Sequence, residues 1–185
     1  MLVALAGIHW ARLSIFDTPT ALWQKMSPVG GYGRSPMAVE FLGDMMTLIW
    51  TKQLSVGNEM LDSEHKDLIG MVNRIEYAIE TRDITALSRA FKLLMNCVYV
   101  HFANEERFAQ AVNIPFEQHR LAHQHLQKEL QHTWNQLEAK NGIWPEYVMD
   151  HYPQFLREWL VECITKEDML MKPALQAYPY DFKPG

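Results

Sequence analysis

The chain has 185 residues, of which 48% are apolar and 21% charged, which is typical of a globular protein with a buried core. A formal net charge of -5 at pH 7 and the lack of any basic run argue against a nucleic-acid surface, and no apolar run is long enough to cross a membrane. Two cysteines, Cys97 and Cys163, cannot make a disulfide framework, and a cytoplasmic location is therefore expected.

Residues 1–45 are predicted to form an extension outside the folded domain. Their apolar start, MLVALAGIHWARL, lacks a basic segment and a small-residue cleavage site, so it does not fit a signal peptide. The stretch SPVGGYGRSP is rich in turn formers and interrupts any periodic pattern. The domain proper is placed at residues 46–185, beginning with MTLIW.

Four later segments carry apolar residues at every third or fourth position, which indicates amphipathic helices. Asp62 or Ser63 is expected to cap the first helix, and Asp83 is expected to cap the second. No segment shows convincing strand alternation. The four apolar stripes cover residues 61–79, 87–108, 116–137 and 148–170.

The connections between these segments are short, so successive helices should lie antiparallel. Gly142 is suited to the left-handed position after the third helix. Pro153 lies within the fourth segment and predicts a kink or a fresh start there. The sequence therefore predicts an all-α protein, an up-down four-helix bundle with a non-bundle N-terminal extension.

Polar side chains that can bind metals fall on the apolar stripes. Residues four apart share one face of a helix, so His101 points with Glu105, and His119 points with His123. Each histidine alone could be a hydrogen-bonded core residue, but burying such groups unpaired costs about 1–3 kcal/mol each. A shared metal ion would satisfy all of them, as in di-iron carboxylate bundles. The candidate residues on the stripes are His65, His101, Glu105, His119, His123 and Cys163.

The same segments resemble bacterial hemerythrins over roughly residues 46–175. The four matching motifs occur in the family's order and are WTKQLSVGNEMLDSEHKDL, HFANEE, HRLAH and WLVECITKED. The resemblance implies two non-heme iron ions that share an oxo or hydroxo bridge and two carboxylates, those of Glu105 and Asp168.

The resemblance also implies how the histidines divide between the two ions. His65 and His101 would hold the iron with an open position, where O2 binds and leaves again. His119 and His123 would hold two positions on the other iron. The expected partner is O2 or another small diatomic ligand; no nucleic acid or membrane is expected, and a protein partner is left unknown.

Cys163 stands where the family has a third histidine on the second iron. Its thiolate can ligate a metal, although its reach is shorter than that of an imidazole. Three alternatives are open: Cys163 binds iron, it is a small buried apolar residue that leaves an open position, or the site binds metal poorly. Glu167 is read as a solvated residue, and Cys97 as a packed core thiol whose pairing with Cys163 is left open.

Three functions follow from these patterns. The first is O2 binding for storage, delivery or sensing. The alternative is a di-iron redox enzyme that acts on peroxide, nitric oxide or O2, with Cys163 altering one iron. The third is an interaction bundle with a relic site. Histidine and carboxylate ligands do not distinguish iron from manganese.

Overall fold

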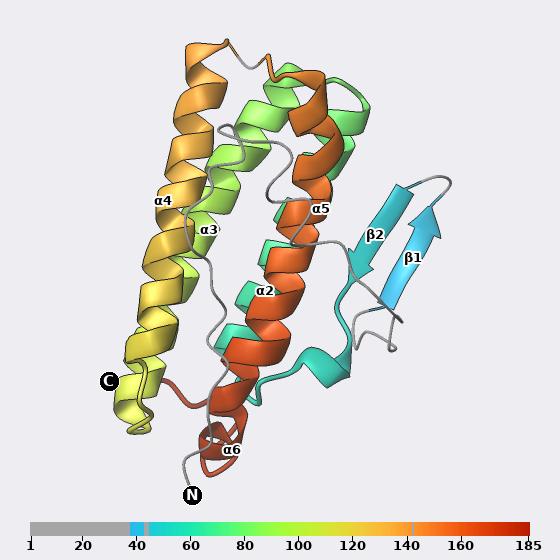
Figure 1. Cartoon of the computed structure of the whole chain (residues 1–185). Helices are drawn as coiled ribbons and strands as arrows, with labels where there is room; N and C mark the ends of the chain where they lie inside the picture. The colour runs from blue at the N-terminus through green and yellow to red at the C-terminus, as the bar shows by residue number, and fades with distance from the viewer. Residues whose placement is uncertain (1–37, 43–44, 142) are drawn as a thin grey trace, which may run out of the picture.

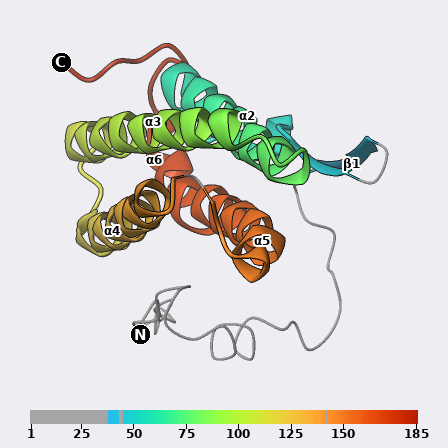
Figure 2. The same ribbon diagram turned by 90° about the horizontal axis from the view of Figure 1, so that it is seen from above.

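A bundle of four long helices dominates the computed structural model, which describes residues 38–42, 45–141 and 143–185 (Figure 1). Helix α2 packs against α3 and α5, and α3 packs against α4, so the four helices surround one centre when seen from above (Figure 2). The predicted all-α, up-down four-helix bundle is confirmed. Its helices are α2 (Glu59–Glu80), α3 (Ile84–Ala111), α4 (Glu117–Ala139) and α5 (Glu146–Glu162).

Helix α2 begins earlier than the sequence predicts, at Glu59. Asn58 is its N-cap, and the side-chain oxygen of Asn58 accepts hydrogen bonds from the backbone N–H groups of Met60 and Leu61. The prediction that Asp62 or Ser63 caps this helix is therefore wrong. An asparagine further upstream already satisfies the first free amides of the helix.

The other predicted helix boundaries have mixed outcomes. Asp83 caps α3 as predicted, because its carboxylate accepts a hydrogen bond from the N–H of Ala86. Pro153 lies inside α5, which already begins at Glu146, so the predicted fresh start at Pro153 is wrong. A helix can tolerate the one backbone bond that an internal proline removes. Gly142 lies outside the described residues.

A short β-hairpin stands beside the bundle, which the sequence patterns did not indicate (Figure 1). Strands β1 (Ala38–Leu42) and β2 (Met45–Ile49) pair antiparallel. Asn73 of α2 joins the hairpin to the bundle, since its side chain exchanges two hydrogen bonds with the backbone of Leu48, of 3.0 and 2.9 Å. The strands are too short for a clear alternation of apolar and polar residues. The domain division at residue 45 remains a prediction, and residues 1–37 and 43–44 lie outside the described part.

Aromatic side chains fill one end of the bundle, which we call the aromatic end. Phe91 is fully buried, with its ring centroid 5.9–6.2 Å from the centroids of three other rings. These neighbours are Trp134, Trp144 and Tyr152. None of the helices in the described ranges is long and apolar enough to cross a bilayer.

The segment after α5 closes the opposite end of the bundle. It contains one π turn (Cys163–Glu167), one 3-10 turn (Asp168–Met171) and the short helix α6 (Lys172–Leu175). Tyr180, further along, donates a hydrogen bond of 3.0 Å to the buried carboxylate of Asp62. A second contact joins Asn58 Nδ2 to the carbonyl oxygen of Phe182 at 2.8 Å. Residues 180–182 are thus tied to the start of α2.

Candidate metal centre

The up-down order of the helices brings all the predicted ligands to one end of the bundle, which we call the polar end. The ligands lie near the start of α2, the end of α3, the start of α4 and the end of α5, and these four termini meet (Figure 1). All of the ligands are buried, with at most 9% of any one exposed. They are His65, His101, Glu105, His119, His123, Cys163 and Asp168.

Asp168 lies between two sets of histidines. Its Oδ1 is 3.1 Å from His119 Nε2, and its Oδ2 is 3.1 Å from His65 Nε2. The same Oδ2 is 4.0 Å from His101 Nε2. Oδ1 therefore faces α4, whereas Oδ2 faces α2 and α3, so the two oxygens point to different histidines, as they would in a carboxylate shared by two ions.

Glu105 occupies a similar central position from the side of α3. Its Oε2 lies 3.3 Å from His123 Nε2 and 3.7 Å from both His119 Nε2 and His101 Nε2. The single carboxylate thus contacts histidines that were expected on both ions. The bridging role that the sequence resemblance implies for Glu105 stays a prediction.

The potential ligand atoms separate into two groups that share Asp168. Within each group, one nitrogen, oxygen or sulfur atom per residue lies within 4.8 Å of all the others. One group is His65, His101, Glu105 and Asp168, and the other is His119, His123, Cys163 and Asp168. Glu167 belongs to neither group and is half-buried.

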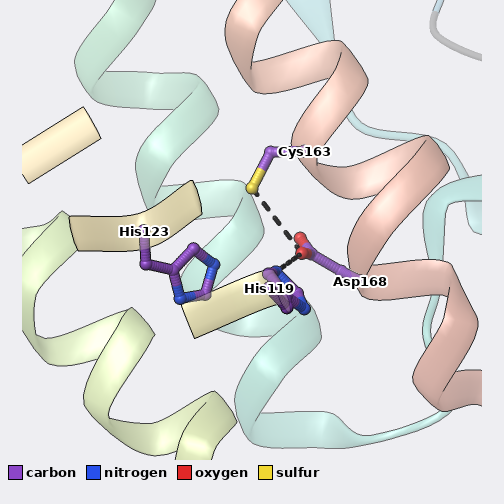
Figure 3. A group of neighbouring side chains, drawn as sticks. All are labelled: His119, His123, Cys163 and Asp168. Carbon is purple, nitrogen blue, oxygen red and sulfur yellow. Dashed lines mark hydrogen bonds and ion pairs between the residues drawn. The ribbon is translucent and has the colours of Figure 1, made fainter. Parts of the chain in front are cut away.

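A π turn explains how Cys163 joins Asp168 although the two are five residues apart. In an α-helix, residues five apart point about 140° away from each other. Here the N–H of Asp168 donates to the carbonyl of Cys163, which is the five-residue hydrogen bond of a π turn. Cys163 Sγ consequently lies 3.6 Å from Asp168 Oδ1, on the side of His119 and His123 (Figure 3).

The two central carboxyls differ in their proton affinity. Burial raises the pKa of Glu105 well above its ordinary value, and the neighbouring charge of Asp168 raises it further. Burial also opposes ionisation of Asp168, but the imidazoles of His119 and His65 beside it outweigh this effect and hold the pKa of Asp168 below its ordinary value. In the metal-free protein, Asp168 is therefore the ionised member of the pair.

Burial favours the neutral form of His123 and His101, which is the form that binds metals. It lowers the pKa of His123 to about 2, with a further contribution from the nearby His119. The pKa of His101 is also lowered, again mainly by burial. Burial raises the pKa of the Cys163 thiol well above its ordinary value, and Asp168 and Glu105 add to this effect. The thiol therefore holds its proton until a cation displaces it.

Many ligand atoms at this end are buried without a hydrogen-bond partner, although native proteins rarely leave such atoms unsatisfied. Cations that take nitrogen, oxygen and sulfur ligands would satisfy them together, so the residues fit a pair of metal ions. The unpartnered atoms are His65 Nδ1 and Nε2, His101 Nε2, both oxygens of Glu105, His119 Nε2, His123 Nε2 and Asp168 Oδ2.

Two further contacts at the site were not found from the sequence. Glu64 hydrogen-bonds to His101 Nδ1, and the ring of Phe102 stacks on His123 with their centroids 3.4 Å apart. Glu64 directly precedes His65, so its place beside a candidate ligand was the available signal.

Cys97 is half-buried against the core, and both cysteines are free thiols.

Comparison with known proteins places this arrangement in a family. The sequence profile described as "Hemerythrin HHE cation binding domain" matches residues 56–175. A bacteriohemerythrin of Methylococcus capsulatus is 28% identical over 138 residues, which cover 72% of this chain and 100% of that protein. A bacteriohemerythrin of Stenotrophomonas maltophilia is 23% identical over 139 residues, which cover 75% and 88%.

Similarity extends to a eukaryotic protein and to a solved structure. A hemerythrin-like protein of Naegleria gruberi is 28% identical over 127 residues, which cover 68% of this chain and 92% of that protein. A crystal structure of a hemerythrin point mutant superposes with a TM-score of 0.61 at 24% identity, covering 69% of this chain and 95% of the other. The fold, the buried donor atoms and the profile match agree. The chain belongs to the hemerythrin family, whose domain binds a di-iron centre of the oxygen-binding type.

Proposed function

We propose that the polar end holds two iron ions and takes up O2 reversibly, for storage, delivery or sensing. In this proposal His65 and His101 hold one ion, and His119, His123 and Cys163 hold the other. Glu105 and Asp168 would be the carboxylates shared between the two ions. The observation that carries the proposal is the division of the donor atoms into two groups that meet at Asp168.

The two ligand groups offer different numbers of donor atoms. The ion with fewer protein ligands would keep a position open for a small molecule. The first group offers two imidazoles besides the carboxylates, whereas the second offers two imidazoles and a thiol. An iron pair can supply electrons to O2 and recover them when O2 leaves. The protein residues contribute imidazoles, a central carboxylate pair and a buried setting that excludes water.

Reconstitution of the metal-free full chain with ferrous iron under anaerobic conditions tests this proposal. We expect two irons per chain, and a visible absorbance on exposure to O2 that disappears under vacuum and returns with fresh O2. His123→Gln should lose this reversible absorbance. His125→Gln is the matched control, because His125 lies on the same helix, is half-buried and belongs to neither group. Irreversible oxidation of the wild type at the first exposure would contradict reversible binding.

Cys163 favours a second candidate function, a di-iron redox enzyme acting on peroxide, nitric oxide or O2. A thiolate donates more charge to a metal than an imidazole and so stabilises its oxidised state. Steady consumption of one of these substrates in the presence of a reductant would support this function. The role given to the cysteine would fail if Cys163→His left the turnover rate unchanged.

A cytoplasmic location is part of the same proposal. The only two cysteines of the sequence are both free thiols, which suits a reducing compartment. Recovery of the protein from the cytoplasmic fraction of its source cells would support this location, and recovery from an oxidising compartment would overturn it.

A further inference from the structure

Glu64 of α2 reaches across to α3 and contacts a ligand on the neighbouring helix. Its Oε2 lies 3.1 Å from His101 Nδ1, and its side chain is 18% exposed whereas that of His101 is 1% exposed. Glu64 directly precedes the proposed ligand His65 in sequence. Successive residues on a helix point about 100° apart, so Glu64 contacts His101 from a different side of α2 than His65 does. From this contact we infer that Glu64 is a positioning residue for His101. The inference rests on the proposed function.

The contact determines which nitrogen of His101 faces the site. A carboxylate only accepts hydrogen bonds, so the neutral imidazole must carry its proton on Nδ1. The lone pair is then on Nε2, which lies 3.7 Å from Glu105 Oε2 and 4.0 Å from Asp168 Oδ2. Nε2 is buried without a hydrogen-bond partner. Glu64 thus prepares the ring to bind a cation with the nitrogen that points into the centre.

Asn104 holds Glu64 in this position from α3. Its Nδ2 donates a hydrogen bond of 2.6 Å to Glu64 Oε1, so that each oxygen of the carboxylate has its own partner. Asn104 and His101 are three residues apart and share one face of α3. Partners of this kind fix the orientation of a ligand histidine, and losing them typically costs about 10- to 100-fold in metal affinity.

His65 provides an internal comparison. Its Nδ1 is buried without a hydrogen-bond partner, so no outer carboxylate holds that nitrogen as Glu64 holds His101 Nδ1. The effect of Glu64 is therefore specific for His101 among the two histidines of this group. A general loss of stability would instead disturb both rings.

Nitrogen-15 NMR of the metal-free full chain measures the tautomer directly, with His101→Gln used to assign the His101 signals. Wild type should show an Nδ1-protonated His101, and Glu64→Ala should move the proton to Nε2 or mix the two forms. Glu64→Gln should restore the wild-type pattern, because an amide oxygen also accepts a hydrogen bond. Asn104→Ala should shift the tautomer in the same direction as Glu64→Ala, but less.

Ferrous-ion titration gives the second readout. We expect Glu64→Ala to bind the ion of the His65 and His101 group about 10- to 100-fold more weakly than wild type. Glu64→Gln should recover most of this lost affinity. Asp67→Asn is the control for charge, because Asp67 is an exposed acid on the same helix. An unchanged His101 tautomer in Glu64→Ala would overturn the inference. If that variant does not fold, an unchanged tautomer in Asn104→Ala would do so. Failure of the wild type to bind iron would refute the proposed function, whereas the NMR comparison needs no metal.

Discussion

The two ends of the bundle are stabilised by different means. At the aromatic end, Phe91 packs with three large rings, and apolar burial dominates, although Trp144 Nε1 and the Tyr152 hydroxyl are also buried without a hydrogen-bond partner. At the polar end, imidazoles and carboxylates are equally buried but keep several atoms without partners. The contrast teaches that one end can stabilise the fold without a cofactor, whereas the other is complete only with cations. Changes at each end should therefore separate stability from metal binding.

Asp168→Asn should have the largest effect on the polar end. The carboxylate serves both ligand groups, and an amide supplies only one oxygen and no charge. We expect both irons to be lost while the helical circular dichroism is kept. Elemental analysis after anaerobic loading measures the metal content, with His125→Gln as the control. A variant that retained both irons would show that Asp168 does not bridge them.

Phe91→Ala should give the converse result at the aromatic end. Removing a fully buried ring typically costs about 3–5 kcal/mol of unfolding free energy. Urea denaturation should show this loss, while the folded variant still binds two irons per chain. Leu93→Ala is a control on the same helix, because Leu93 is 40% exposed. Loss of one iron in folded Phe91→Ala would mean that the two ends are coupled.

Cys163→Ser should affect one ion more than the other. Cys163 contributes to only one ligand group, so we expect that ion to bind at least about 10-fold more weakly, because losing even an outer partner of a ligand typically costs that much, while the other ion binds as in wild type. Two-step ferrous titration would resolve the two affinities. Cys97→Ser serves as the control, since Cys97 lies in neither group. Equal affinities in Cys163→Ser and wild type would show that the cysteine is not a ligand.

Glu76→Gln should have the smallest effect, visible in the pH dependence of stability. Burial raises the pKa of Glu76 from 4.5 to about 7; Arg157 opposes this shift, and Glu80 adds to it. Folding therefore favours the protonated acid, and its contribution to stability is lost as pH rises from about 4.5 through 7. Between these pH values the unfolding free energy should fall by roughly 1–2 kcal/mol less in Glu76→Gln than in wild type. This is smaller than the full pKa shift would give, because Glu76 forms an ion pair with the partly solvated Arg157.

Urea denaturation of the metal-free protein at pH 5 and pH 8 measures that difference. Glu59→Gln is the matched control, since Glu59 is an exposed glutamate at the other end of the same helix. A parallel decline in wild type and Glu76→Gln would assign the pH dependence to other groups, such as the carboxyls of the polar end.

Much of the bundle could be predicted from the sequence, because apolar periodicity directly reports which face of a helix is buried. Histidines and glutamates on that face, such as His101 with Glu105, drew attention to the polar end for the same reason. Asp168 came only from the family resemblance, because a spacing of five residues does not share a face in an ordinary α-helix. The π turn that brings Asp168 to the side of Cys163 depends on tertiary packing, which the apolar periodicity of the sequence does not report.

The remaining features depend on contacts between distant parts of the chain. Asn58 was missed as the N-cap of α2. Its side chain is also held by the carbonyl of Phe182, and this contact across 124 residues is not visible in the local sequence. The hairpin was missed because its strands are short and are joined to the bundle through Asn73. Glu64 was not singled out, since its contact with His101 crosses between two helices.

The π turn between Cys163 and Asp168 makes the site respond unequally to insertions and deletions. Deleting one of the four residues between them would leave a spacing of four, which an ordinary α-helix already places on one face. The last helix would then follow the pattern of His101 with Glu105 and of His119 with His123. Inserting one residue would instead move the acid about 240° around an α-helix from the cysteine. Relatives that differ in length here should therefore be shorter by one residue more often than longer.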